Sequence, residues 1–255
     1  MNKKASYLSL TNSKLADKPN EDFILIDNER GIFILLDGVS RDTVNGVYPN
    51  PSPAALVTKE FANSALSFIA SGLDNLKNPK EIDYMALIRG GFEHGNRCIF
   101  EKNKSWEDGF LPGTVGIILI LQDNVGYFGF IGDCFGMTLG DNGKKVFTRV
   151  QTKAVHENKS SYTSYEIRHL ICNNFGHPVG YGVLNGNEDA LKFVEYGQFS
   201  LDGLEQILLY TDGFENLLGD YPVDKLATLH VDEISEMQSV RNEVKADDRS
   251  IIIIR

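Results

Sequence analysis

Two helical patterns stand together in residues 52–102, with strand-like runs on both sides, and this grouping narrows the range of possible folds considerably. In the first pattern, apolar residues such as Phe61, Ala65 and Phe68 recur near the spacing of one helix face. The second pattern, in residues 82–102, repeats this spacing although glycines interrupt it. Helices grouped together with strands around them indicate an α+β fold rather than alternating α/β units.

The strand-like runs are β-rich segments separated by turn residues. Residues 23–27 and 31–36 predict a hairpin, and the runs that follow the helices predict an antiparallel meander. We expect these later strands at 114–121, 125–131, 135–139, 145–148, 191–199, 206–210 and 250–254. Residues 151–187 are polar and irregular, and short helices are predicted at 164–172, 214–218 and 223–230.

The composition excludes several classes of protein. A chain of 255 residues with 42% apolar and 24% charged residues predicts one soluble globular domain, residues 1–255. Three cysteines without paired spacing fit a reducing compartment, and no apolar run approaches the roughly 20 residues that cross a bilayer. We therefore expect a cytoplasmic protein without membrane partners. The net charge of −10 argues against nucleic-acid binding.

Three apolar strands each end in an aspartate beside a glycine, at Asp37, Asp133 and Asp212. A single case would indicate only a turn. Further acids, at positions 21–22 and 247–248, come just before two other strands. If these strand ends converge, the carboxylates would repel one another unless cations lay among them.

The residue types around these aspartates indicate which cations would fit. An all-oxygen site favours Mg²⁺ or Mn²⁺, because zinc, copper and iron sites normally include His or Cys, and neither flanks the aspartates. Two such ions about 3.5–4 Å apart would activate a water and hold phosphoryl oxygens for in-line displacement. The aspartates therefore predict hydrolase chemistry.

Taken in order, the short motifs of the chain resemble those of a known family. The resemblance runs from about residue 6 to the C-terminus, and the family is the type 2C, or PPM, metal-dependent protein serine/threonine phosphatases, in the form of a bacterial-style single catalytic domain. The motifs are Asn20-Glu21-Asp22, Leu36-Asp37-Gly38, Gly113-Thr114, Ile131-Gly132-Asp133, Tyr210-Thr211-Asp212-Gly213 and Asp247-Asp248.

The resemblance implies a four-layer αββα fold, an antiparallel β-sandwich flanked by helices, with two or three Mn²⁺ or Mg²⁺ ions at one end and a flap at about residues 151–187. It also implies a role for each acid, with Asp22, Asp37 and Asp212 as the catalytic ones. Asp37 would bridge two metals, and Gly38 would offer its carbonyl. Asp212 and Asp247 would hold the first metal, and Glu21 would support the second through water. Asp22 would orient metal-bound waters, and Asp133 with Asp212 would hold a third metal.

The sequence departs from the family pattern beside two of these motifs. Asp37-Gly38 is followed by Val39-Ser40-Arg41 instead of a second glycine pair. The family arginine that grips the substrate phosphate, four residues before the glutamate, is Asp17 here. Lys18 and Arg41 are the nearest basic candidates for this role, and Arg41 is preferred because a guanidinium holds two phosphate oxygens at once.

The resemblance predicts hydrolysis of phosphoserine and phosphothreonine in proteins by a metal-activated water. The natural partners would be phosphorylated substrates of a serine/threonine kinase, and the protein would be a monomer. Two alternatives stay open. A catalytically impaired member would serve as a phosphoprotein-binding or regulatory module, which the missing arginine favours and the retained acids disfavour. A hydrolase of small phosphoesters is the other.

Overall fold

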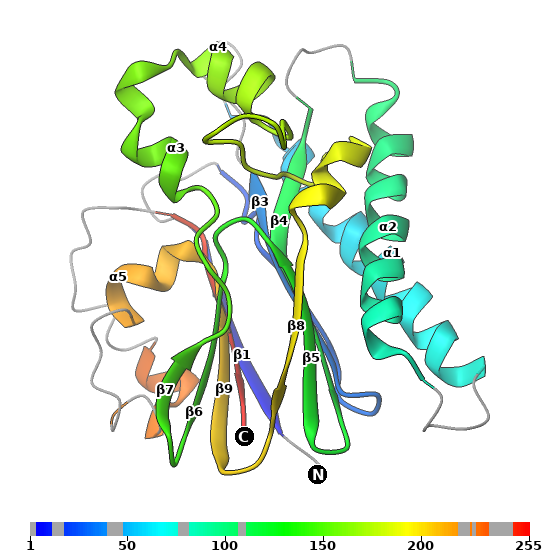
Figure 1. Ribbon diagram of the computed structural model, residues 1–255, viewed down its shortest axis with the longest axis vertical. Helices are drawn as coiled ribbons and strands as arrows, with labels where there is room; N and C mark the ends of the chain where they lie inside the picture. The colour runs from blue at the N-terminus through cyan, green and yellow to red at the C-terminus, as the bar shows by residue number, and fades with distance from the viewer. Residues whose placement is uncertain are drawn as a thin grey trace.

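A computed structural model of the chain describes residues 4–11, 18–39, 48–75, 82–106, 111–218, 225, 228–234 and 247–255. Its centre consists of two five-stranded antiparallel sheets, ordered β1-β10-β9-β6-β7 and β2-β3-β4-β5-β8 (Figure 1). The strands are β1 Ala5–Leu10, β2 Phe23–Asp27, β3 Ile32–Val39, β4 Gly113–Gln122, β5 Val125–Ile131, β6 Phe135–Gly140, β7 Gly143–Val146, β8 Glu195–Ser200, β9 Leu204–Tyr210 and β10 Arg249–Ile254.

Helical segments lie outside both sheets. The long helices α1 and α2 pack on each other and cover the sheet that contains β3, while α5 lies on the other side of the molecule (Figure 1). The labelled α-helices are α1 Pro53–Asn75, α2 Tyr84–Asn103, α3 Lys153–Glu157, α4 Ser164–Glu166 and α5 Glu215–Leu218, and the described residues 231–234 are also helical. Shorter turns of other helix types are Lys159–Ser161, Ile167–Ile171, Glu188–Phe193 and Asp212–Phe214. The predicted α+β, αββα arrangement is confirmed.

The layers follow from the alternation of side chains along each strand. In β3, Ile32, Ile34 and Leu36 face α1 and α2, whereas Phe33 and Leu35 face the opposite sheet. All five are at most 1% exposed, so this strand is buried on both faces and reads as a continuous apolar run. Since Asp37 comes directly after this run, burial of the strand holds the aspartate's backbone in place.

The glycines that interrupt the second helical pattern have a packing role. A Cβ atom added to Gly95 would lie 2.5 Å from the ring of Phe61 in α1, so glycine permits the close approach of the two helices. Asp83 begins α2 by accepting a hydrogen bond from the backbone N–H of Ala86, at 2.9 Å. The low helix propensity of glycine is therefore offset by the close packing of α1 against α2.

Several elements differ from the sequence prediction. Strand β1 was not predicted, because its apolar content is low and its stability comes from pairing with β10, Ala5 opposite Ile254. The strand expected at 191–199 begins only at Glu195, after a 3₁₀ turn, and the one expected at 145–148 lies at Gly143–Val146. Half of the helix expected at 223–230, residues 223, 224, 226 and 227, lies outside the described residues. No helix in the described ranges is long and apolar enough to span a membrane.

Candidate functional site

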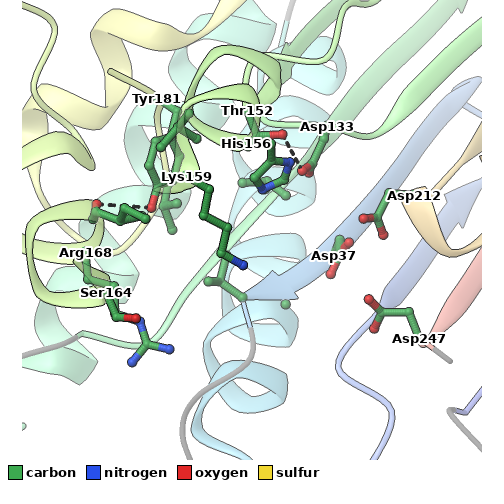
Figure 2. A pocket seen from close by; sticks show the side chains of 16 residues that line it. Asp37, Asp133, Thr152, His156, Lys159, Ser164, Arg168, Tyr181, Asp212 and Asp247 are labelled. Atoms are coloured by element: carbon green, nitrogen blue, oxygen red, sulfur yellow. Dashed lines mark hydrogen bonds between the residues drawn. The ribbon is translucent and has the colours of Figure 1, made fainter. Parts of the chain in front are cut away.

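Four aspartates from both sheets meet at one end of the sandwich. Asp37 lies near the end of β3 and Asp133 follows β5, whereas Asp212 follows β9 and Asp247 precedes β10 in the other sheet. Figure 2 shows their side chains around a common space. The convergence of strand ends that the sequence argument took as a condition is thus present in the structure.

The space between these aspartates and residues 151–187 is a cavity of about 370 Å³. One wall carries the carboxylates, and the other is formed by side chains of the 151–187 segment (Figure 2). The lining residues are Asp37, Gly38, Val39, Val115, Asp133, Thr152, Val155, His156, Lys159, Ser164, Ile167, Arg168, Tyr181, Val183, Asp212 and Asp247.

Asp22 is absent from the cavity lining and connects the two sheets. Its Oδ2 atom accepts a hydrogen bond from the Thr211 hydroxyl at 2.9 Å, and that hydroxyl oxygen accepts one from the Ser250 backbone N–H at 3.0 Å. The other oxygen, Oδ1, is buried without a hydrogen-bond partner among the described residues. A buried carboxylate oxygen normally has a partner, so this atom suits a bound cation or its water.

Burial and mutual repulsion dominate the electrostatics of the aspartates. The Asp37 carboxyl is surrounded by protein, which raises its pKa well above the ordinary range, and the negative charges of Asp22 and Asp212 raise the pKa further. Burial likewise raises the pKa of Asp22 to about 8, against the opposing hydrogen bond from Thr211. Positive charge at this point would relieve both effects.

The 151–187 segment is attached to the aspartate wall by side-chain hydrogen bonds. Thr152 donates to Oδ2 of Asp133 at 2.9 Å, and the Gly132 backbone N–H donates to Oε1 of Gln151 at 2.8 Å. On the neighbouring strand, the Thr114 hydroxyl donates to the Asp37 carbonyl oxygen at 2.8 Å. Both the strand end at Asp133 and the one at Asp37 are therefore held by threonines.

Gly38 is required by close packing beside Asp37. A Cβ atom at this position would lie 2.7 Å from the Glu21 carbonyl oxygen and 3.0 Å from the Thr58 hydroxyl. Any side chain would push the chain around Glu21 away from β3. The glycine therefore keeps the backbone beside Asp37 against the segment that carries Glu21 and Asp22.

Glu21 is 1% exposed, and both of its carboxylate oxygens have protein partners. Oε1 accepts hydrogen bonds from the hydroxyls of Tyr48 and Ser52, and Oε2 lies 3.1 Å from the Lys18 ammonium. Lys18 also donates to Asp248 at 2.8 Å. The phosphate-binding role of Lys18 stays a prediction, but this geometry favours a structural role for the ammonium. Arg41 lies outside the described residues.

The donor set fits hard divalent cations by its chemistry. The aspartates and the Gly38 carbonyl offer only oxygen, and the unpartnered Oδ1 of Asp22 adds a further acceptor. No group of three His, Cys, Asp or Glu side chains in the described ranges is tight enough to form a complete ligand cluster. The aspartates surround a shared space instead of contacting one another, which is the arrangement expected of carboxylates that repel each other.

Sequence reasoning missed the other wall of the cavity. His156, Lys159, Arg168 and Tyr181 all line it, whereas the prediction considered basic residues only near the aspartates in sequence. The signal was available in the predicted flap, since this polar segment carries several basic residues that the prediction did not weigh.

Comparison of the fold with solved structures gives similar proteins that cover nearly the whole chain. The serine/threonine phosphatase PstP/Ppp of Mycobacterium tuberculosis matches with a TM-score of 0.66 and 17% identity, over 99% of this chain and 97% of that one. A PstP catalytic domain in complex with 2 manganese ions matches with a TM-score of 0.65 and 16% identity, over 99% and 97%. Stp1 of Staphylococcus aureus matches with a TM-score of 0.64 and 14% identity, over 99% and 94%.

The chain therefore has the four-layer αββα fold with an aspartate-lined cavity at one end of its sandwich. This is the fold of the bacterial type 2C serine/threonine phosphatases, as the order of the sequence motifs predicted. No protein-family model matches the sequence, and no curated protein matches it either. The similarity is thus one of structure, at sequence identities of 12–17%.

Proposed function

We propose that this protein is a metal-dependent phosphatase that hydrolyses phosphoserine and phosphothreonine in proteins. The observation that carries the proposal is the convergence of Asp37, Asp133, Asp212 and Asp247 on one cavity from strands of both sheets. Burial and mutual repulsion hold the pKa of Asp37 far above its ordinary range, which disfavours such a group unless cations offset the charge. The solved phosphatases of the same fold support this assignment.

The residues that would hold the cations are those on the carboxylate wall. Asp37 lies centrally and would bridge two ions, Asp212 and Asp247 would hold one of them, and Asp133 would contribute to a third. When bound, Mn²⁺ or Mg²⁺ would supply a water of lowered pKa and would neutralise charge on phosphate oxygens. Asp22, whose charge acts on Asp37, would orient water through its unpartnered Oδ1 atom.

The remaining residues of the site keep this geometry in place. Thr211 fixes Asp22 by its hydrogen bond, Thr114 fixes the backbone at Asp37, and Thr152 fixes Asp133. Glu21 is so fully engaged by Lys18, Tyr48 and Ser52 that its main contribution would be to position the segment before β2. Preorganised acceptors of this kind contribute to catalysis because they need no rearrangement during the reaction.

The test measures the release of phosphate from a phosphothreonine peptide in the presence of Mn²⁺. We expect the release to stop in excess chelator. The same measurement with p-nitrophenyl phosphate and a panel of nucleotides separates the alternatives. Turnover of small phosphoesters alone would indicate a small-phosphoester hydrolase. Binding of the phosphopeptide with no turnover of any compound would indicate a phosphoprotein-binding module. Full activity after exhaustive chelation would contradict a metal-dependent mechanism.

A further inference from the structure

The two walls of the cavity carry opposite charges. Asp37, Asp133, Asp212 and Asp247 form one wall, and Lys159 and Arg168 lie on the other. Lys159 belongs to a short 3₁₀ turn, Lys159–Ser161, between α3 and α4. Figure 2 shows its side chain extending from this turn towards the side of the cavity where Asp37 lies.

A phosphate group entering this cavity would meet a strongly acidic wall. A doubly charged phosphate is held best by charge-assisted hydrogen bonds from cationic side chains. Of the two cations proposed from the sequence, Lys18 is already held by carboxylates. Lys18 is 5% exposed and lies against Glu21 and Asp248, and Arg41 is outside the described ranges.

Lys159 differs from three other basic residues in the range 149–192. Lys153 lies 3.8 Å from Glu157, Arg149 lies 2.6 Å from Glu195, and Lys192 lies 2.7 Å from Asp189. Within the described part of the chain, the exposed Lys159 ammonium has no ion pair, although its side chain lines an acidic cavity. A lysine held at such a wall without a carboxylate partner is available to an anionic ligand.

The backbone of Lys159 is fixed by its own turn. The Tyr162 backbone N–H donates to the Lys159 carbonyl at 3.3 Å, and the Ser161 N–H donates to the Asn158 carbonyl at 2.9 Å. The neighbouring helix α3 is tied to the opposite wall through Thr152 and Asp133. The base of the lysine is therefore positioned, while its four-carbon side chain retains the reach of a mobile point charge.

We propose that Lys159 is the phosphate-binding cation of this protein and holds the substrate phosphate from the side opposite the aspartates. This inference rests on the proposed function and names the group that binds the phosphate at the same site. Arg168, which lines the cavity near Tyr181, is the competing candidate on the same wall. The cavity of about 370 Å³ would receive one phosphorylated side chain.

Binding of inorganic phosphate to the Mn²⁺-loaded protein, measured by calorimetry, tests the inference without requiring turnover. We expect Lys159→Ala to raise the Kd for phosphate about tenfold and Lys159→Arg to restore most of the affinity. The matched control is Lys153→Ala, since Lys153 is also exposed, lies in the adjacent helix and is absent from the cavity lining. It should leave the Kd within about twofold of the wild-type value.

Steady-state kinetics with a phosphothreonine peptide adds a second readout. Lys159→Ala should raise KM with a smaller change in kcat, because a ground-state clamp contributes mainly uniform binding. The inference would be overturned by an unchanged phosphate Kd in Lys159→Ala, or by an equal loss of phosphate affinity in Lys153→Ala. It would also be overturned if phosphate affinity were lost only in Arg168→Ala, or if the wild type did not bind phosphate. A wild-type protein that binds phosphate through Lys159 without any turnover would contradict the proposed phosphatase function and leave this assignment intact.

Discussion

The ammonium of Lys18 lies 2.8 Å from Oδ2 of Asp248, in a region where the two side chains are only 4% and 3% exposed. Burial alone would lower the pKa of Lys18, but the hydrogen bond to Asp248 and the charge of Glu21 raise it above its ordinary value. The contact joins residues separated by 230 positions and fastens the segment before β2 to the start of β10. Lys18 is thus a buried link between the two sheets.

Replacing Lys18 by methionine should destabilise the protein by about 3–5 kcal/mol, because the buried carboxylates of Glu21 and Asp248 would lose their common cation. Urea unfolding measures this change in the free energy of unfolding. The control is Lys104→Ala, which breaks an exposed pair with Glu101 and should cost less than about 1 kcal/mol. A stable Lys18→Met protein with a raised KM for phosphopeptides would instead support the phosphate role predicted from the sequence.

Asp37→Asn should lower kcat by at least about 10²-fold while the protein stays folded, because it removes the central carboxylate of the site. Asp212→Asn should behave in the same way. Without metal, either variant should unfold at the same temperature as the wild type or higher, since a repelling charge is lost. Thermal unfolding with chelator and with Mn²⁺ separates the effects: Mn²⁺ should stabilise the wild type more than the variants. Near-normal kcat in Asp37→Asn would place the chemistry elsewhere.

Asp133→Ala should reduce turnover and leave two metal ions bound per protein. The reason is that Asp133 stands at the end of β5, beside the 151–187 segment, and its Oδ2 is shared with Thr152. Calorimetric titration with Mn²⁺ gives the number of sites. Thr152→Val provides a comparison, since it removes the hydrogen bond and keeps the carboxylate. Loss of all metal binding in Asp133→Ala would show that this residue belongs to the central pair.

The free energy of unfolding should fall as the pH rises above about 9, in the ordinary titration range of thiols and phenols. Burial raises the pKa of Cys172 to about 12 and that of Tyr196 also to about 12. In the unfolded chain these groups ionise at lower pH, so the unfolded state loses protons first and is favoured as the pH rises through this window.

Urea unfolding between about pH 8 and about pH 11 would measure the slope of this dependence. Tyr196→Phe is the informative variant, because it removes the titrating hydroxyl and keeps the ring that packs edge-on against Phe92. Its slope should be shallower than that of the wild type. Equal slopes in both proteins would show that Tyr196 does not contribute to the alkaline loss of stability.

Local patterns in the sequence determined most of the elements and the carboxylates of the site. Three signals are each contained within a few residues: the apolar run of β3, the spacing of Phe61 and Ala65 in α1, and an aspartate beside a glycine near the end of β3 and after β9. Such signals need no knowledge of distant contacts. They were sufficient to predict an α+β fold with acids at several strand ends, whereas the meeting of these ends at one cavity is seen only in the tertiary structure.

Contacts between distant residues were decided only by the tertiary structure. Strand β1 forms because it pairs with β10 from the other end of the chain. Lys18 has a structural role because its ammonium forms an ion pair with Asp248. Lys159 faces the wall of Asp37, although 122 positions separate them in the sequence, because the 151–187 segment folds over the strand ends. A sequence pattern shows which face of a segment is apolar and will be buried. Which charged residues become neighbours depends on how the segments pack together once these faces are buried, and this is decided by the whole fold.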